Sequence, residues 1–376
     1  MSLYKSPYEG LETPALLLSR PAFERNLSRM RSKVESAGLA LRPHVKTVKC
    51  AQAWLRALGS APRVTVSTLL EAEDAFANGV VDILYAVGIA PSKLARAAAL
   101  VERGADLTLA VDTVEAARAV AAAGGAAGVT LPAVVEIDSD GHRAGVASGS
   151  ELALAVARAL KAPGARFRGV MTHAGGSYAC GSPDEIAGMA ERERAAVVNA
   201  AAALAEAGLP SEIISMGSTP TVTFARSFAG VTEARVGVYM TMDLVMADLG
   251  VCSTDDIALS VATSVIGRQP LRGEILIDAG WMAMSRDPGS GRHGLGRVCD
   301  AFGAPIGDLV VSSANQEHGI VTSPGGGAIA FDDFPVGRAL RVLPNHACAT
   351  GAQFDRYHVL DEAGRIEAIW PRINGW

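Results

Sequence analysis

An alternation of short apolar runs with alanine-rich segments fills residues 40–239 and constrains the fold more than any other feature of the chain. The apolar runs have the length of strands. They are 40–46, 63–68, 82–87, 106–112, 131–138, 166–175, 212–219 and 233–239. The segments between them have helical length, and several end at glycine. They are 51–59, 70–79, 92–104, 114–124, 150–164 and 185–208. This order predicts an α/β fold, a (β/α)8 TIM-like barrel.

An open doubly wound sheet is the rival fold, because it also alternates strands and helices. No glycine-rich dinucleotide-binding fingerprint follows the first strand, which weakens this alternative.

After about residue 250 the pattern changes to short β-branched runs separated by turns, which predicts an all-β domain. The runs are 256–269, 274–281, 308–321, 338–348 and 356–361. A short apolar run at 14–18 precedes a helix that begins at Pro21 and ends near Gly38. We therefore expect a barrel domain at 20–250 and a C-terminal all-β domain made of 251–376 with 1–19. The turn-rich loop 284–296 is expected to be mobile or to bind a ligand.

Composition excludes several classes of protein. Hydrophobic residues make up 49% of the 376 residues and charged residues 19%, as in a well-buried enzyme. The 34 basic and 39 acidic residues form no long run of either sign, so neither nucleic acid nor a membrane surface is an expected partner. No apolar stretch is long enough to span a membrane, and the N-terminus lacks a signal-peptide core, which predicts a cytoplasmic location. The cysteines are odd in number and scattered, which argues against a disulfide framework.

Lys46 is the first candidate catalytic residue. If 40–46 is a strand, side chains alternate between its faces, so His44 and Lys46 point the same way, into the barrel. Burial disfavours a charged ammonium, and a neutral lysine forms Schiff bases with carbonyl compounds such as pyridoxal 5'-phosphate (PLP). An ordinary surface lysine at a strand end is the alternative.

The C-terminal ends of the later barrel strands carry small, polar and basic residues, which is where a barrel places its active site. These residues are Arg143, His173, Ser218, Thr219, Arg235, Gly237 and Tyr239. Ser218 and Thr219 follow Gly217, and such donor-rich loops after the last strands can hold phosphate. The run AERERAA at 190–196 is expected to be a solvated helix face.

A candidate metal site lies in the β domain. His346 and Cys348 are two residues apart, so a strand or an extended loop would place both on one face. Thiolate and imidazole suit Zn²⁺, with Mn²⁺ or Mg²⁺ as alternatives, and water, substrate or another side chain would complete the shell. Polar residues in breaks of apolar strands are candidates for supporting the site or the substrate. They are His44, Asp278, Gln316, Glu317 and His318.

Several motifs occur together and in order: RPHVKT, DGHR, THAG, GSTPT, DAGWMAMSRD, NQEHG and PNHACATGAQF. With them the chain resembles the fold-type III PLP enzymes that act on D-3-hydroxy amino acids. This family has an alanine racemase-like barrel and comprises D-serine dehydratases, D-threo-3-hydroxyaspartate dehydratases and metal-activated D-threonine aldolases. The pattern is most similar to the hydroxyaspartate dehydratases. The aldolases carry aspartate where Cys348 stands.

The resemblance implies a role for each candidate residue. Lys46 would hold PLP and abstract the α-proton of the substrate. Arg143 would contact the phenolic oxygen and His173 the ring face, while Ser218, Thr219 and Gly237 would hold the phosphate. Arg235 or Tyr239 would approach the pyridine nitrogen. His346 and Cys348 would hold the metal that assists loss of the β-hydroxyl group.

The implied activity is a lyase that converts D-threo-3-hydroxyaspartate to oxaloacetate and ammonia, or D-serine to pyruvate and ammonia. The main alternative is a metal-activated D-threonine aldolase that yields glycine and an aldehyde. A racemase would need a second base, for which the sequence offers no secure candidate, and a non-catalytic PLP carrier would normally lack the β domain. The family also implies a homodimer with its site near the interface.

Overall fold

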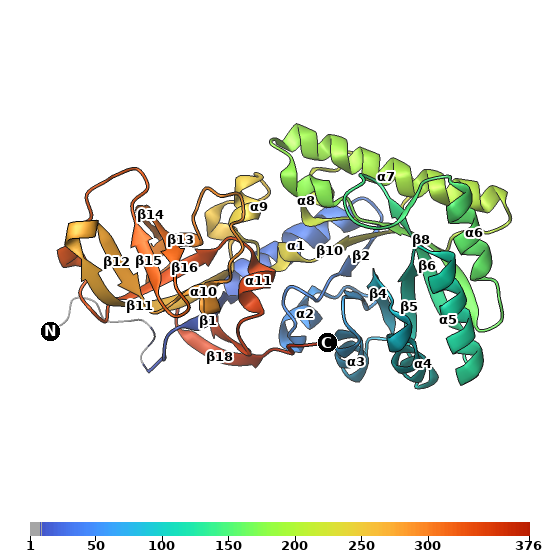
Figure 1. The fold of residues 1–376 in the computed structure, drawn as a ribbon, viewed down its shortest axis with the longest axis horizontal. Helices are drawn as coiled ribbons and strands as arrows, with labels where there is room; N and C mark the ends of the chain where they lie inside the picture. Colours follow the sequence, from blue (N-terminus) through green and yellow to red (C-terminus); the bar gives the residue numbers. More distant parts are fainter. Residues whose placement is uncertain (1–7, 9) are drawn as a thin grey trace. The chain divides into compact units, whose positions relative to one another are not determined.

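The computed structural model describes residue 8 and residues 10–376, and these divide into two compact units. The first unit contains the chain up to Leu27 together with Val238–Asn374. The second unit contains Ser28–Gly237 and the last two residues. Figure 1 shows both, with the α/β unit running from blue through green and the β unit mainly in yellow to red.

A parallel sheet forms the framework of the second unit. Its strands are β2 (Ala40–Pro43), β3 (Arg63–Val66), β4 (Asp82–Gly88), β5 (Asp106–Val111), β6 (Leu131–Asp138), β8 (Ala165–Thr172), β9 (Ile213–Met216) and β10 (Glu233–Val236). They pair in the order β2-β10-β9-β8-β6-β5-β4-β3, and the short β7 (Val146–Ala147) pairs with β6. A bridge between His44 and Thr65 joins the two ends of this order. The predicted (β/α)8 barrel is therefore confirmed within the described residues.

Helices follow the strands. They are α1 (Arg20–Glu35), α2 (Ala51–Ala57), α3 (Leu69–Ala77), α4 (Leu94–Glu102), α5 (Val114–Ala127), α6 (Glu151–Ala159), α7 (Pro183–Glu206) and α8 (Thr219–Phe224). Hydroxyl side chains cap several N-termini by accepting the amide N–H three residues later. The capping residues are Thr68, Thr113, Ser150, Ser182 and Ser218. These caps fix where each strand-to-helix connection turns.

A buried ionic cluster closes the N-terminal end of the barrel. The Arg42 guanidinium is buried and donates to Glu233 at 2.9 Å and to Asp82 at 2.8 Å. Glu233 and Asp82 are the first residues of β10 and β4, respectively. This end of a barrel serves stability, which leaves the opposite end of the strands for chemistry.

The first unit is a β domain. Its strands are β1 (Ala15–Ser19), β11 (Leu259–Gln269), β12 (Glu274–Ile277), β13 (Gly296–Asp300), β14 (Pro305–Ala314), β15 (Gly319–Thr322), β16 (Ala339–Pro344), β17 (Arg356–Leu360) and β18 (Ile366–Pro371). The sheet order is β12-β15-β14-β13-β16-β11-β1-β17-β18. Because β11 also pairs with β12, the strands from β12 to β11 close into an antiparallel barrel.

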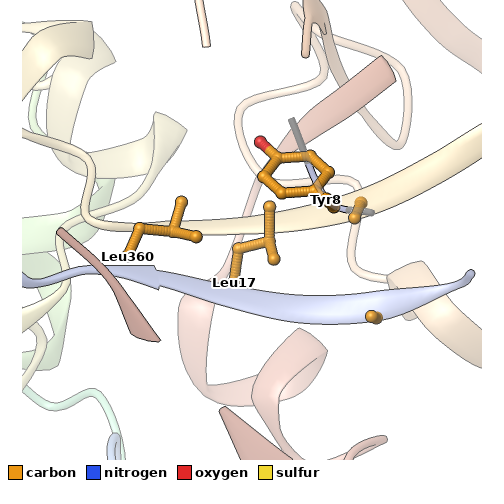
Figure 2. Close-up of a cluster of buried hydrophobic side chains, with 5 residues drawn as sticks. Tyr8, Leu17 and Leu360 are labelled. Atoms are coloured by element: carbon orange, nitrogen blue, oxygen red, sulfur yellow. The ribbon is translucent and has the colours of Figure 1, made fainter. Parts of the chain in front are cut away.

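Strand β1 links this barrel to the C-terminal strands, since it pairs antiparallel with β11 and parallel with β17. Its residues Ala15 and Leu17 pack with Tyr8, Ala262 and Leu360 in a buried cluster. Figure 2 shows Leu17 and Leu360 lying close to the Tyr8 ring. Tyr8 and strand β1 are therefore part of the core of the β unit.

The ends of several predicted strands differ from the sequence-based ranges. The first strand ends at Pro43, so Lys46 lies in a turn and not on the strand face that it was predicted to share with His44. The predicted run 308–321 is two strands, β14 and β15, joined by an exposed turn. The run 338–348 ends as a strand at Pro344, and helix α11 (Ala347–Gly351) follows. Strands β13 and β18 lie outside the predicted runs.

Candidate active site

Lys46 stands at the C-terminal end of the first barrel strand, as predicted, but its side chain is exposed. It is therefore not the buried strand lysine of the sequence-based argument. Within the described residues, the Lys46 ammonium group forms no ion pair. The neighbouring Lys49, by contrast, pairs with the buried carboxylate of Glu71 at 2.9 Å. Of these two lysines, Lys46 has the amine that is accessible for chemistry.

Two neutral histidines lie near Lys46. His44 Nδ1 accepts the Lys46 amide N–H at 3.5 Å, and Nε2 is 3.3 Å from the Ser67 hydroxyl. His173 lies just after β8, and its Nδ1 is 3.0 Å from the carbonyl oxygen of Gly217, to which it donates. Burial, with the charges of Arg143, Lys46 and Arg235, lowers the pKa of His173 to about 3, against the hydrogen bond to the Gly217 carbonyl, which raises it. Burial, Lys46 and Arg235 likewise hold the pKa of His44 well below its usual range.

These depressed pKa values predict loss of stability in acid. The unfolded chain takes up protons on both histidines as the pH falls below 6.5, whereas the folded protein resists this uptake. The free energy of unfolding should therefore be fully present above pH 6.5 and should decrease toward the folded pKa values. In a His173→Gln variant the slope between about pH 6 and pH 4 should fall by about 1.4 kcal/mol per pH unit. Urea unfolding at several pH values measures the slope, and His318→Gln, on an exposed turn, is the control.

A buried cluster of hydroxyl groups follows β9. Ser218 is 3% exposed, and its hydroxyl lies 3.0 Å from the hydroxyls of both Ser177 and Thr221. Thr219 is buried beside it. Ser177 comes from the short helix η2 (Gly175–Ala179), which follows His173 in the chain. The predicted phosphate residues Ser218 and Thr219 thus lie in a compact, buried group of hydroxyl side chains, to which Ser177 and Thr221 were not predicted to contribute.

Arg143 lies on the loop after β6 with its side chain about half exposed. Its Nη2 donates to the buried Glu136 carboxylate at 3.2 Å. The same loop is attached to the segment after His173, because Asp140 accepts the Gly176 amide N–H at 2.7 Å. The charge of Arg143 acts on His173, so the structure brings these two predicted residues together.

Arg235 is buried and already engaged. Its guanidinium donates to the Ser215 hydroxyl at 2.7 Å and to the Thr172 carbonyl. Gly237 lies against the first strand, since a Cβ at this position would come within 3.2 Å of His44 and Thr47 atoms. Tyr239 is fully buried on the short helix η3 (Val238–Met240). The hydrogen bonds of Arg235 to Ser215 and to the Thr172 carbonyl give this residue a structural function in addition to its charge.

Glu193 corrects the prediction that 190–196 is a solvated helix face. This residue of α7 is 0% exposed. Its Oε1 accepts the amide N–H of Ala174 at 2.9 Å and that of Gly217 at 3.1 Å. No motif indicated this role, because a charged helix normally faces water. The only hint was that the helix runs next to strands whose ends are predicted to be functional.

In the β unit, His346 and Cys348 come together at the start of helix α11. His346 is the N-cap residue and Cys348 lies in the first turn. Cys348, with smaller contributions from Asp287 and Asp243, raises the pKa of His346 to about 10, against the effect of burial. The predicted pair is therefore adjacent, but through a helix start and not through the alternation of a strand.

A carboxylate supports the imidazole of this pair. Asp287 Oδ2 is 2.7 Å from His346 Nδ1, which leaves Nε2 for another partner. A carboxylate behind a histidine is the usual support of a metal-binding imidazole. Asp243 accepts the Ala347 amide N–H at 2.9 Å, and burial raises its pKa to about 6. Asn345 donates to the carbonyls of Asp287 and Gly294, which attaches the loop 284–296 to this segment.

The remaining candidates of the β unit have other contacts. Asp278 accepts hydrogen bonds from Thr13, Thr263 and the Ser264 amide at 2.5–2.9 Å, which ties strands together. Gln316, Glu317 and His318 are exposed on the β14–β15 turn. Backbone carbonyls of this turn accept the first amides of helix α10 (Trp281–Met284).

His346 and Cys348 alone are fewer protein ligands than a zinc site usually has. Among the residues that the structure describes, no group of three or more His, Cys, Asp and Glu side chains is arranged to hold a metal ion. A thiolate beside an imidazole whose other nitrogen is bound to carboxylate nevertheless fits a zinc-type ion that shares its shell with water or substrate.

No helix in the described part of the chain is long and apolar enough to cross a membrane.

A lysine-bearing parallel barrel joined to an antiparallel β unit defines an alanine racemase-like fold. A family model described as the alanine racemase N-terminal domain matches residues 18–245, and a serine dehydratase domain model matches 258–360. A D-threo-3-hydroxyaspartate dehydratase from Delftia sp. (strain HT23) is 49% identical, over 97% of this chain and 98% of its own length. A D-threonine aldolase from Arthrobacter sp. is 30% identical, over 97% and 93%.

Solved structures agree with the sequence comparisons. A cysteine-to-alanine variant of a D-threo-3-hydroxyaspartate dehydratase, in a metal-free form, superposes with a TM-score of 0.94 at 47% identity, covering 98% of this chain and 99% of that one. The chain therefore belongs to the alanine racemase-like family of PLP-dependent lyases that includes dehydratases and aldolases of D-3-hydroxy amino acids.

Proposed function

We propose that this enzyme is a D-3-hydroxy amino acid dehydratase that uses PLP and zinc. Its preferred reaction would convert D-threo-3-hydroxyaspartate to oxaloacetate and ammonia, with D-serine to pyruvate and ammonia as the second candidate. The observation that carries the proposal is the His346–Cys348 pair with Asp287 bound to the imidazole. The chain is 49% identical to a dehydratase but 30% identical to an aldolase, which also supports a dehydratase.

The barrel residues fit PLP. Lys46 offers an accessible amine, and the buried, hydroxyl-bearing segment at Ser218 and Thr219 would contact the phosphate. His173 is neutral and would face the ring without adding charge, while Arg143 would face the phenolic oxygen. When bound, PLP supplies an electron sink for the electrons released at Cα. Arg235 or Tyr239 would lie toward the pyridine nitrogen, and Gly237 would leave room for the phosphate.

The protein side chains then move protons and hold charge. In its neutral form, the Lys46 Nζ would take the α-proton of the substrate as a general base. Because His44 and His173 are neutral, they add no positive charge around it. His346 and Cys348 would hold zinc, which supplies Lewis acidity for the departing β-hydroxyl. Asp287 keeps the His346 imidazole in the orientation that leaves Nε2 available.

Assay of the products tests this proposal. The purified protein is given D-threo-3-hydroxyaspartate, D-serine and D-threonine separately, and 2-oxo acid plus ammonia is compared with glycine plus aldehyde. We expect 2-oxo acid and ammonia, with the highest kcat/KM for D-threo-3-hydroxyaspartate. Glycine and aldehyde as the main products would establish the aldolase alternative, which can use the same cofactor and the same metal.

We also predict a homodimer with its site near the interface, and a cytoplasmic location. Sedimentation of the purified protein measures the oligomeric state.

Asp287 provides a separate test of the metal site. Replacement with asparagine removes the carboxylate that holds His346 Nδ1 but leaves both proposed ligands in place. We expect the affinity for zinc to fall by about 10- to 100-fold, the range seen when such supporting carboxylates are removed. Competition with a zinc-chelating dye measures the change. Asp308→Asn, on an exposed hairpin of the same unit, is the control and should bind zinc normally.

A further inference from the structure

Glu193 connects two loops that are far apart in the sequence. One loop begins at Ala174, immediately after His173, and the other begins at Gly217, immediately before Ser218. A single carboxylate oxygen of Glu193 accepts the first amide N–H of each loop, at 2.9 Å and 3.1 Å. His173 adds a third link, since its Nδ1 donates to the Gly217 carbonyl.

The backbone at Gly217 makes this connection sensitive. Its φ of +135° is a conformation that residues with a side chain rarely adopt, and a Cβ there would lie 2.4 Å from the Arg235 carbonyl oxygen. The backbone of Gly217 is thus held in one tightly packed position: its N–H donates to Glu193, and its carbonyl oxygen accepts a hydrogen bond from His173. A shift of the Gly217 backbone would move both His173 and Ser218.

The carboxylate lies in a polar but buried environment. Burial raises its pKa, while the Thr221 hydroxyl, the two amide groups and the positive charge of Arg235 favour its ionised form. Because Glu193 occupies the amides of Ala174 and Gly217, those amides are not available to a ligand.

We propose that Glu193 is a positioning residue that sets the spacing between the His173 loop and the Ser218 loop, and thereby aligns the ring-contacting and phosphate-contacting sides of the PLP site. The proposal rests on the proposed function, since it assumes that these loops hold PLP. It assigns to Glu193 no contact with substrate or cofactor.

The test compares PLP with pyridoxal, which has the same ring and aldehyde but no phosphate. Dissociation constants for both are measured by absorbance titration of the full-length protein after removal of bound cofactor, for the wild type, Glu193→Gln, Glu193→Asp and Glu193→Ala. Glu191→Gln is the matched control, because Glu191 lies on the same helix but is exposed and pairs with Arg194. Circular dichroism in the far ultraviolet checks folding, and the visible band of bound PLP reports its orientation.

We expect Glu193→Gln to bind PLP within about 3-fold of the wild type, because an amide oxygen can accept the same two N–H groups. Glu193→Asp keeps the charge but is one methylene too short. It should weaken PLP binding by at least about 10-fold, the scale of one lost buried hydrogen bond, and weaken pyridoxal binding much less. Glu193→Ala should do the same if it folds, and the visible circular dichroism band should change in both.

Two results would overturn the inference. One is a folded Glu193→Asp protein that binds PLP as the wild type does. The other is an equal loss for PLP and pyridoxal, which would indicate general destabilisation. A wild-type protein that binds neither compound would refute the proposed function itself, so the two failures are distinguishable.

Discussion

Replacement of Lys46 with alanine is expected to abolish lyase activity, with a loss of at least about 10⁴-fold in kcat. Proton transfer by one positioned group contributes up to about this factor, and the same side chain is proposed to attach PLP covalently. The variant should also lose the yellow absorbance of lysine-bound PLP. Because Lys46 is exposed and takes part in no described ion pair, its removal should leave the free energy of unfolding nearly unchanged.

Matched lysine variants make this prediction specific. Lys161→Ala removes an exposed lysine at the end of α6 and should leave both activity and colour intact. Lys49→Ala should instead destabilise the fold, since it leaves the buried Glu71 carboxylate without its ion pair. A Lys46→Ala protein that retained the yellow band after dialysis would show that another amine holds the cofactor, and would end the assignment of Lys46.

The fold was predictable from sequence because it depends on patterns that repeat. Each barrel strand is a short apolar run followed by a helical segment, and Thr68, Thr113 and Ser150 mark helix starts by capping them. Closure of the barrel does not follow from this alternation alone, because an open doubly wound sheet alternates in the same way; the missing glycine-rich fingerprint after the first strand favoured the barrel. The strand ends were less predictable, since the change from strand to turn at Pro43 or Met216 depends on loops that pack against one another.

The site was only partly predictable for a related reason. Lys46 and the His346–Cys348 pair were predicted from the sequence, but the strands expected to carry them end earlier, at Pro43 and Pro344. Glu193 and Asp287 were not predicted and become candidates only from the structure. Each acts across a long sequence separation, on Gly217 and on His346, and only the folded chain brings these groups within hydrogen-bonding distance.

Replacement of Cys348 with alanine is the second large effect that we expect. It removes the thiolate from a site where the described residues supply no set of three ligands, so the remaining His346 cannot hold zinc alone. Bound zinc, measured by elemental analysis, should fall to background. Dehydration should slow by at least about 100-fold, since Lewis-acid assistance is worth several kcal/mol and each 1.4 kcal/mol is tenfold. PLP binding should persist, because the predicted cofactor residues are elsewhere in the chain.

Two further variants separate a lost metal from a damaged fold. Cys252→Ala removes another partly buried cysteine of the same unit and should retain zinc and activity. Cys348→Asp replaces the soft thiolate by a hard carboxylate, the residue type implied for the related aldolases, and should shift metal preference from Zn²⁺ toward Mn²⁺ or Mg²⁺. If Cys348→Ala kept its zinc and its dehydratase activity, the ligand pair would be wrong. Recovery of Cys348→Asp by Mn²⁺ but not by Zn²⁺ would place the metal at this position and make the identity of its ligand the determinant of metal choice.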